Sequence, residues 1–74
     1  MQEVRADMAA NVWKHVVREG DRVEDGDVLV VLESMKMEIP LYSEWRGVVN
    51  SLAVPEGAVV QEGDLIVLVD DAAA

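Results

Sequence analysis

The sequence contains an internal repeat at an offset of 37 residues, and this repeat restricts the fold more than any other feature. Between residues 12 and 33 the first copy shares eight identities in 22 positions with the second copy, without a gap. The matched glycines are the most informative, because Gly20 aligns with Gly57 and Gly26 with Gly63 at positions where a Cβ would restrict the backbone. We therefore predict two copies of one motif, related by a pseudo-two-fold axis.

Each copy is predicted to form a strand, a turn, a short strand, a second turn and a longer strand. An acid–glycine pair occurs in each of these four turns. A further strand opens each copy, since Val4 aligns with Leu41 and Met8 with Trp45. The predicted strands are 4–8, 12–17, 22–24 and 28–32 in the first copy and 38–42, 48–54, 59–61 and 65–69 in the second.

No segment has an apolar stripe at helical spacing over three turns. We predict an all-β chain that forms a flattened barrel or sandwich of two four-stranded halves, interlocked so that few strand edges stay open. The 74 residues are expected to form one domain with its core at about 4–70 and frayed ends at 1–3 and 71–74. Within 12–17 the two-residue alternation is imperfect, which leaves open a bulge or burial of both faces.

Composition restricts the classes of function. The formal net charge of −9 repels nucleic-acid phosphates and anionic lipids, so we expect neither nucleic acid nor a membrane as a partner. The acids keep a small domain soluble, and a docking role towards a basic partner surface stays open. The longest apolar runs have five residues, and no secretory signal or cysteine is present, so we expect a soluble, cytoplasmic monomer.

The sequence shows no pattern of catalytic or metal-binding residues. His15 is the only histidine, with no second ligand or nucleophile spaced near it, and we expect it to be structural or on the surface. The carboxylates cluster at turns rather than as a convergent pair, and the glycines do not form a phosphate loop. Trp13 and Trp45 are expected in the core or covering an edge rather than stacked on a cofactor. We therefore expect a non-catalytic chain without a metal.

Residues 33–38, with the sequence Glu-Ser-Met-Lys-Met-Glu, lie where the first copy ends and the second begins, so the chain must reverse there. Tight hairpins favour glycine-containing pairs such as Asn-Gly, because their central residues need φ > 0. This chain omits glycine here although it uses acid–glycine pairs at its other four turns. A local rule that is broken at one site indicates function rather than folding.

Lys36 lies at the centre of this segment. Its ε-amine can form a stable amide with an activated carboxyl group once a modifying enzyme removes its proton, whereas an arginine could not. If the segment is extended, Met35 and Met37 share the side opposite Lys36 and form an apolar collar for that enzyme. Methionines as core filler, and Glu33 and Glu38 as ordinary surface acids, are the alternatives. The residues alone indicate a modified lysine on a hairpin and do not name the attached group.

The segment resembles the attachment motif of biotinyl domains, which commonly read Ala-Met-Lys-Met after an acid. Gly20-Asp21 and Gly26-Asp27 lie where that family has its turns, and Gly47 matches the glycine after the motif. The resemblance covers about 4–70 and is to the free-standing biotin/lipoyl attachment proteins of bacteria. Methionine on both sides of the lysine favours biotin, since lipoyl domains typically have an aspartate before it. The departures are Ser34 for the usual alanine, Ala10 opposite Gly47, and Asp7 where many relatives have proline.

The resemblance implies the barrel-sandwich hybrid fold of biotinyl and lipoyl domains. It also implies that a biotin–protein ligase attaches biotin covalently to Lys36 and recognises the neighbouring Met35, Met37, Glu33, Ser34 and Glu38. The tethered biotin would then carry a carboxyl group between the biotin carboxylase and carboxyltransferase components of a carboxylase. The alternatives are a lipoyl carrier and an unmodified barrel module such as those of efflux adaptors.

Overall fold

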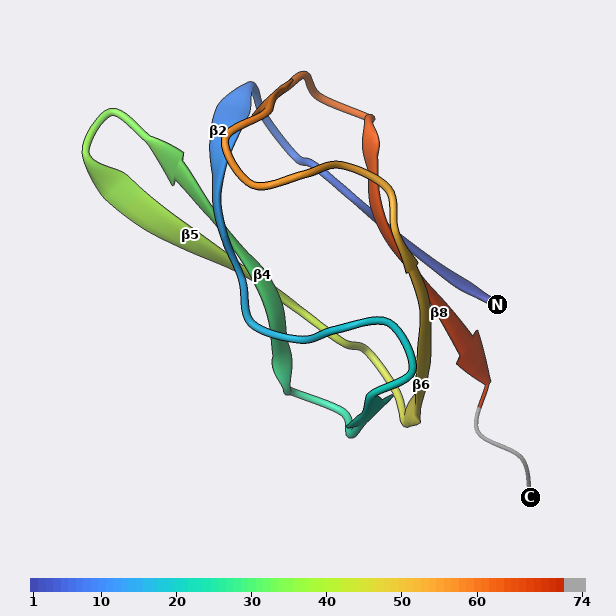
Figure 1. Ribbon diagram of the computed structural model, residues 1–74. Coiled ribbons are helices and arrows are strands. Elements are labelled where there is room, and N and C mark those ends of the chain that lie inside the picture. The colour runs from blue at the N-terminus through green and yellow to red at the C-terminus, as the bar shows by residue number, and fades with distance from the viewer. Residues whose placement is uncertain (72–74) are drawn as a thin grey trace.

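The computed structural model of the protein describes residues 1–71, which form eight β-strands and no helix (Figure 1). The strands are β1 (Gln2–Arg5), β2 (Ala10–His15), β3 (Arg22–Val23), β4 (Val28–Ser34), β5 (Met37–Tyr42), β6 (Gly47–Leu52), β7 (Val59–Val60) and β8 (Leu65–Asp71). They form two antiparallel four-stranded sheets, ordered β1-β8-β6-β3 and β5-β4-β2-β7. The predicted all-β architecture is confirmed. Residues 1–71 contain no helix long and apolar enough to cross a membrane.

The two sheets are related by the pseudo-two-fold axis that the repeat predicts. Val12 pairs with Leu32 in one sheet, and the residues 37 positions later, Val49 and Val69, pair in the other. Each sheet contains strands of both copies, because β3 of the first copy pairs with β6 of the second, and β7 of the second pairs with β2 of the first. Neither copy therefore completes a sheet by itself.

Hydrogen bonds across the axis hold the copies together. The Glu56 side chain accepts a hydrogen bond from the backbone N–H of His15 at 2.8 Å, and its aligned counterpart Glu19 accepts one from the N–H of Leu52 at 3.3 Å. The Nε2 atom of His15 lies 2.8 Å from the carbonyl oxygen of Val54. His15 thus links β2 of the first copy to the segment that follows β6 in the second, which confirms its structural role.

The turns differ between the copies in one informative respect. The four aligned glycines all have φ between 89° and 91°, in the left-handed region: Gly20, Gly26, Gly57 and Gly63. In three turns the aspartate after the glycine caps the turn, as Asp21 does by accepting a hydrogen bond from the Arg18 N–H at 2.9 Å. In the fourth turn Pro55 replaces Arg18 and has no N–H to bond. Accordingly, the position aligned with Asp21 is Ala58, which has no carboxylate to accept such a bond.

The core lies between the two sheets and is built from aligned residues. Burying one Val or Leu side chain contributes about 1.5–3 kcal/mol, so equivalent positions in both copies stabilise the same contact surface. The aligned pairs that are both fully buried are Val12 and Val49, Val23 and Val60, Leu29 and Ile66, Val30 and Val67, and Leu32 and Val69.

The N-terminal boundary differs from the prediction. The first strand begins at Gln2 rather than at residue 4, because the Gln2 side chain is buried and its amide bonds the Ser43 hydroxyl at 3.3 Å and the Glu44 N–H at 2.8 Å. The expectation of frayed ends is therefore wrong for Gln2 and Glu3, and also for Asp71, which ends β8. Of the other residues expected to be frayed, Met1 precedes β1 and is exposed, and 72–74 lie outside the described part of the chain.

The irregular pattern at residues 12–17 arises from a bulge. The register of β2 against β4 shifts between Val12 and Lys14, which leaves Trp13 at the bulge, and β6 has the equivalent shift between Val49 and Ser51. Trp13 is 49% exposed and Trp45 is 41% exposed, so neither tryptophan belongs to the core.

Candidate cofactor-attachment site

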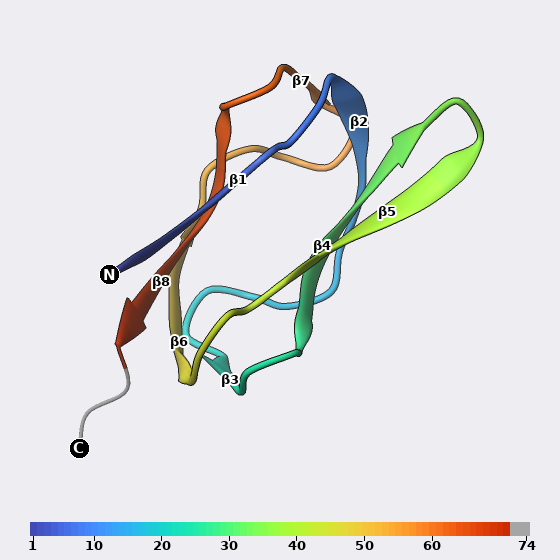
Figure 2. The same ribbon diagram turned by 180° about the vertical axis from the view of Figure 1, so that it is seen from behind.

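Strands β4 and β5 extend beyond the rest of their sheet. They pair with each other as far as Ser34 and Met37, whereas the pairing of β4 with β2 ends at Glu33 and Asn11. Residues 34–37 therefore form the tip of a hairpin without a neighbouring strand. The two opposite views show this hairpin projecting from the body of the molecule, away from the N-terminus (Figures 1 and 2).

Met35 and Lys36 form the two-residue turn at the tip. Their φ angles are 52° and 67°, and they are the only non-glycine residues with positive φ in the described chain. Two central residues with positive φ are characteristic of a type I′ hairpin turn. Holding an ordinary L-residue in this region costs about 1–2 kcal/mol. The backbone conformation thus requires the glycine or asparagine that the sequence does not supply.

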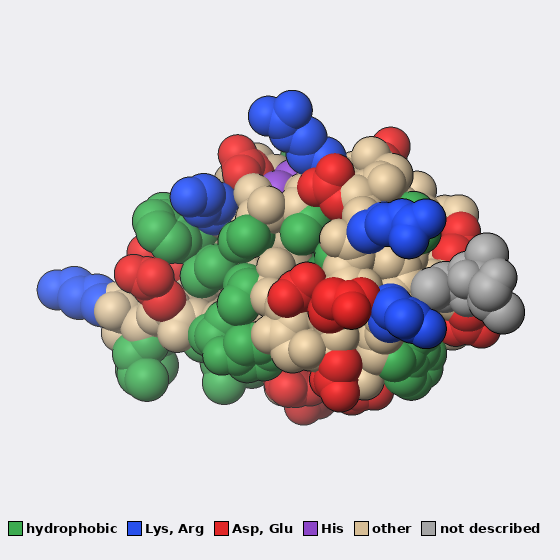
Figure 3. All heavy atoms as spheres, turned by 90° about the horizontal axis from the view of Figure 1, so that it is seen from below, with side chains coloured by type: hydrophobic (Ala, Val, Ile, Leu, Met, Phe, Trp, Pro, Cys, Tyr) green, Lys and Arg blue, Asp and Glu red, His purple; other side chains and the backbone are tan. Residues whose placement is uncertain are grey.

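The methionines beside Lys36 face water. Met35 is 92% exposed and Met37 is 66% exposed, so the alternative that they fill the core is wrong. Because Met35 lies in the turn itself, the extended arrangement with both methionines opposite Lys36 is also wrong. Lys36 is exposed as well. In Figure 3 the end of the molecule where the hairpin projects has a basic side chain at its outermost point and hydrophobic side chains near it.

Glu33 and Glu38 lie directly opposite each other on β4 and β5, just behind the tip. Both are exposed, and neither forms an ion pair within residues 1–71. Like charges at directly opposed positions destabilise a strand pair. Ser34, partly buried, pairs with Met37 and closes the hairpin. The structure therefore brings together all the residues that the sequence singled out at 33–38, and a second folding rule is broken at the same site.

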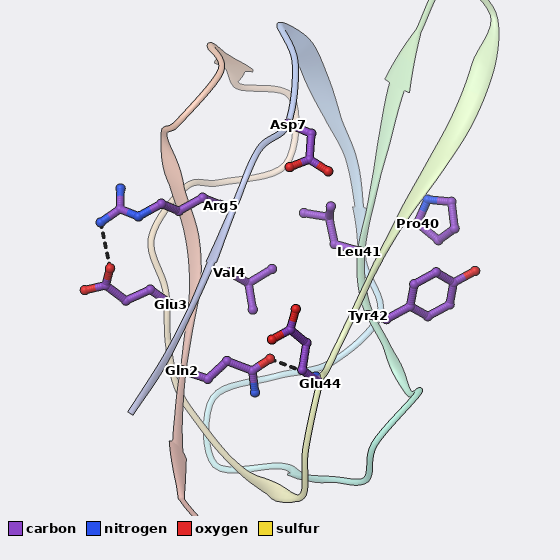
Figure 4. A pocket seen from close by; sticks show the side chains of 9 residues that line it. All are labelled: Gln2, Glu3, Val4, Arg5, Asp7, Pro40, Leu41, Tyr42 and Glu44. Carbon is purple, nitrogen blue, oxygen red and sulfur yellow. Dashed lines mark hydrogen bonds and ion pairs between the residues drawn. The ribbon is translucent and has the colours of Figure 1, made fainter.

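Two hollows on residues 1–71 lie away from this site. One groove, with a volume of about 420 Å³, opens between β1 and β5 and is crossed by the Gln2–Glu44 hydrogen bond (Figure 4). A second hollow, of about 580 Å³, lies at the pseudo-two-fold axis beside His15 and Glu56. Neither is lined by any residue of 33–38. The described residues also contain no group of three or more His, Cys, Asp or Glu that could hold a metal ion. The geometry suits a group displayed outward on a side chain.

Comparison with known proteins identifies the family. The family model described as "Biotin-requiring enzyme" matches residues 2–69. The chain belongs to the biotin/lipoyl attachment family. Among curated members, the "Biotinylated protein TB7.3 homolog" of Mycobacterium leprae is 50% identical over 68 residues, which cover 92% of this chain and 96% of the relative. The "Biotin/lipoyl attachment protein" of Bacillus subtilis is 44% identical over 63 residues, covering 85% of this chain and 86% of that protein.

Among solved structures, this attachment protein is similar to a domain of a large carboxylase. It superposes on a single-chain, multi-domain long-chain acyl-CoA carboxylase with a TM-score of 0.89 and 30% identity. That match covers 99% of this chain but only 7% of the carboxylase. The chain therefore corresponds to one small domain of such an enzyme, and the predicted barrel-sandwich fold of the biotinyl type is confirmed.

Proposed function

We propose that this chain is a biotin acceptor and carrier in which biotin is joined covalently to Lys36. The observation that carries the proposal is the strained hairpin tip, where an exposed lysine occupies a left-handed turn position between two exposed methionines. Membership of the biotin/lipoyl attachment family and likeness to proteins named as biotinylated support it.

Lys36 fits the carboxyl group of biotin chemically. The lysine Nζ atom attacks the activated carboxyl carbon, a C–N bond forms, the bond to the leaving group breaks, and the amine proton passes to a base of the ligase. The product is a neutral amide on a flexible four-carbon stem. Because Lys36 is exposed at a projecting turn, a ligase can reach it without unfolding either sheet.

Only one other lysine is present in the chain, and it tests the role of the hairpin. Lys14 is also exposed, but it lies within β2 and pairs with Val31 of β4. Exposure alone therefore does not distinguish the two amines, whereas position does, because only Lys36 lies beyond the sheet. We propose that the ligase selects Lys36 through the side chains around it: Met35, Met37, Glu33, Ser34 and Glu38.

The attached biotin would supply the carboxyl-transfer chemistry, and the protein would supply the tether. A tethered group reaches its partners at an effective concentration on the order of millimolar, well above that of a free cofactor. We propose that biotin carboxylase and carboxyltransferase components act on it in turn, and that the chain itself is a non-catalytic cytoplasmic monomer. The likeness to a domain of an acyl-CoA carboxylase supports these partners.

Lipoate is the second candidate for the attached group. The name of the Bacillus subtilis relative includes both biotin and lipoyl attachment, and that is the observation in favour of lipoate. The methionine pair around Lys36 favours biotin. An unmodified barrel module would leave the strained, methionine-flanked lysine without a purpose.

Co-expression with a bacterial biotin–protein ligase, followed by intact-mass measurement, tests the proposal. We expect one biotinyl addition on the wild-type chain and on Lys14→Arg, and none on Lys36→Arg. An unmodified wild-type chain, or equal modification of Lys36→Arg, would refute it. Co-expression with a lipoate ligase is the parallel experiment, and a lipoyl addition without a biotinyl one would favour the second candidate.

A further inference from the structure

The outer face of the sheet that carries the hairpin is unusually apolar. Its exposed hydrophobic side chains include Trp13 at 49%, Tyr42 at 52% and Val59 at 68% exposure. They extend across the sheet from β5 through β2 to β7. In Figure 4, Pro40 and Tyr42 point to the opposite side of β5 from the buried Leu41. The hydrophobic side chains visible in Figure 3 gather mainly on the half of the molecule that ends in the projecting hairpin.

Because of the internal symmetry, the composition of this face can be compared with that of the matching face on the other sheet. Each outer position of this sheet has a counterpart 37 residues away in the other sheet, with the same strand register. The fold makes equal demands on both members of a pair, so a systematic difference between them reflects something other than folding. The apolar residues Trp13, Pro40, Tyr42 and Val59 have as counterparts Asn50, Glu3, Arg5 and Arg22. Three matched pairs differ in the opposite sense: Asn11 against Val48, Lys14 against Ser51 and Glu38 against Met1.

The polar residues of the two sheets also differ in their partners. On the other sheet, Arg5 pairs with Glu3 at 2.8 Å, and Asn50 donates a hydrogen bond to Asp70 at 2.9 Å. Their polar groups are thus satisfied within the chain. On the hairpin sheet, Glu33 and Glu38 face each other without an ion pair in residues 1–71. Two unpaired carboxylates beside an apolar surface fit a protein partner that presents hydrophobic side chains flanked by Lys or Arg.

The surface is continuous with the attachment site. Glu38, Glu33, Asn11 and Val59 lie in one register row across the four strands. From Lys36 to Tyr42 along β5 is six residues, or about 20 Å at the usual rise of a strand. A standard interface covers about 800 Å² on each partner, a patch roughly 30 Å across. One partner of ordinary size is therefore large enough to contact the tip and the apolar face together.

From these observations we propose that the outer face formed by Trp13, Pro40, Tyr42 and Val59, with the Glu33–Glu38 pair, is the docking surface for the biotin–protein ligase. This proposal rests on the proposed function. The reason for the ligase, rather than a carboxylase component, is reach. A ligase must bring the Lys36 amine itself to within about 3–3.5 Å of the activated carboxyl carbon, so it must dock closely around the hairpin. A carboxylase component would instead act on the ring of the attached biotin, which lies at the far end of the lysine side chain and away from the protein surface.

The proposal can be tested by replacing residues of the apolar face with those at the symmetry-related positions of the other sheet, because the fold already accepts these residues there. The test variant is Trp13→Asn with Tyr42→Arg, since each new residue already occupies the matched position of the other sheet. The control is Asn50→Arg, which adds the same charge on the opposite sheet. Circular dichroism checks that all chains fold, and the single variant Tyr42→Arg, on an exposed edge strand, replaces the double variant if that one does not fold.

The measurement is the kinetics of biotinylation of the unmodified chain by a bacterial biotin–protein ligase. We expect the test variant to raise KM at least ten-fold with little change in kcat, and the control to stay within two-fold of wild type. As a readout of binding alone, the Lys36→Arg chain is added as a competitive inhibitor, and its inhibition constant is expected to rise at least ten-fold when the two test substitutions are included.

Three results would overturn the proposal and leave the proposed function intact. One is wild-type KM and inhibition constants for the test variant, with the wild-type chain still biotinylated, which rejects the docking surface and leaves the proposed function intact. Another is a wild-type dimer in sedimentation that the test variant dissociates, which assigns the face to a second copy. The third is an unchanged ligase KM together with slower carboxylation by a biotin carboxylase, which assigns the face to that enzyme. A wild-type chain that no ligase biotinylates refutes the proposed function and this proposal with it.

Discussion

The strain at the hairpin tip has a measurable consequence for stability. Met35 and Lys36 occupy the left-handed region with φ of 52° and 67°. We expect the double variant Met35→Asn/Lys36→Gly to be more stable than the wild type, because Asn-Gly is the pair that a type I′ turn prefers. Glycine at position 36 releases about 1–2 kcal/mol of backbone strain, and asparagine at position 35, which tolerates the left-handed region only in part, releases roughly half as much. The flexibility of the new glycine in the unfolded chain takes back about 0.5–1 kcal/mol.

These opposing effects leave a net gain of about 1–2 kcal/mol in the free energy of unfolding. In a domain of this size each kcal/mol raises Tm by about 4–8 °C, so the variant should melt roughly 5–15 °C higher. Urea unfolding of the unmodified chains, followed by circular dichroism, measures the difference. Gly26→Ala is the reciprocal control. Its φ is +91° and no atom lies within 4 Å of the added Cβ, so its loss of stability, about 1–2 kcal/mol, has a purely conformational origin.

The turn account fails if the Asn-Gly variant is no more stable than the wild type while Gly26→Ala is destabilised. That outcome would mean that contacts of Met35 and Lys36 offset the strain, in which case the residues at the tip are favourable for folding. Met35 and Lys36 would then serve folding, and their departure from the usual turn residues would not indicate function.

Two further tests, with three substitutions, concern the packing and the turns of the scaffold. Gly47→Ala should lower the free energy of unfolding by about 3 kcal/mol or more, because the added Cβ would overlap the backbone carbonyl oxygen of Asp70. Urea unfolding measures this loss. A loss below about 1 kcal/mol would show that β6 and β8 can move apart at little energetic cost. Asp21→Ala should lower the free energy of unfolding by about 1 kcal/mol, because the Arg18 N–H loses its hydrogen bond to the Asp21 side chain. Adding Arg18→Pro should recover most of this stability, because a proline has no N–H to satisfy, as at Pro55. Additive effects of the two substitutions in a double-mutant cycle would contradict this coupling.

Much of the fold follows from the repeat. The alignment of Gly20 with Gly57 and of Gly26 with Gly63 predicts four turns, and all four glycines have the left-handed φ that makes glycine informative. A repeat also predicts a two-fold axis. It does not predict which strands pair, because exchange of β3 and β7 between the copies depends on contacts far apart in the sequence.

The features that sequence patterns miss depend on tertiary contacts. Burial of Gln2 depends on hydrogen bonds to residues 41 and 42 positions away, so its polar side chain at the chain end resembles a frayed terminus. The bulge at Trp13 shifts burial by one residue, which no local propensity reveals. The site itself was accessible from the sequence, because a missing turn glycine is a local signal. The apolar outer face was not, although the comparison of Tyr42 with Arg5 across the repeat contains the signal.

The central claim is that Lys36 carries biotin, and fragmentation mass spectrometry of the biotinylated wild-type chain tests it most directly. The chain has only two lysines and one N-terminal amine, so fragment ions assign the modification without ambiguity. We predict a single biotinyl group on Lys36, with Lys14 and the N-terminus unmodified. Biotin on Lys14 or on the N-terminus, or a lipoyl group on Lys36, would contradict the claim.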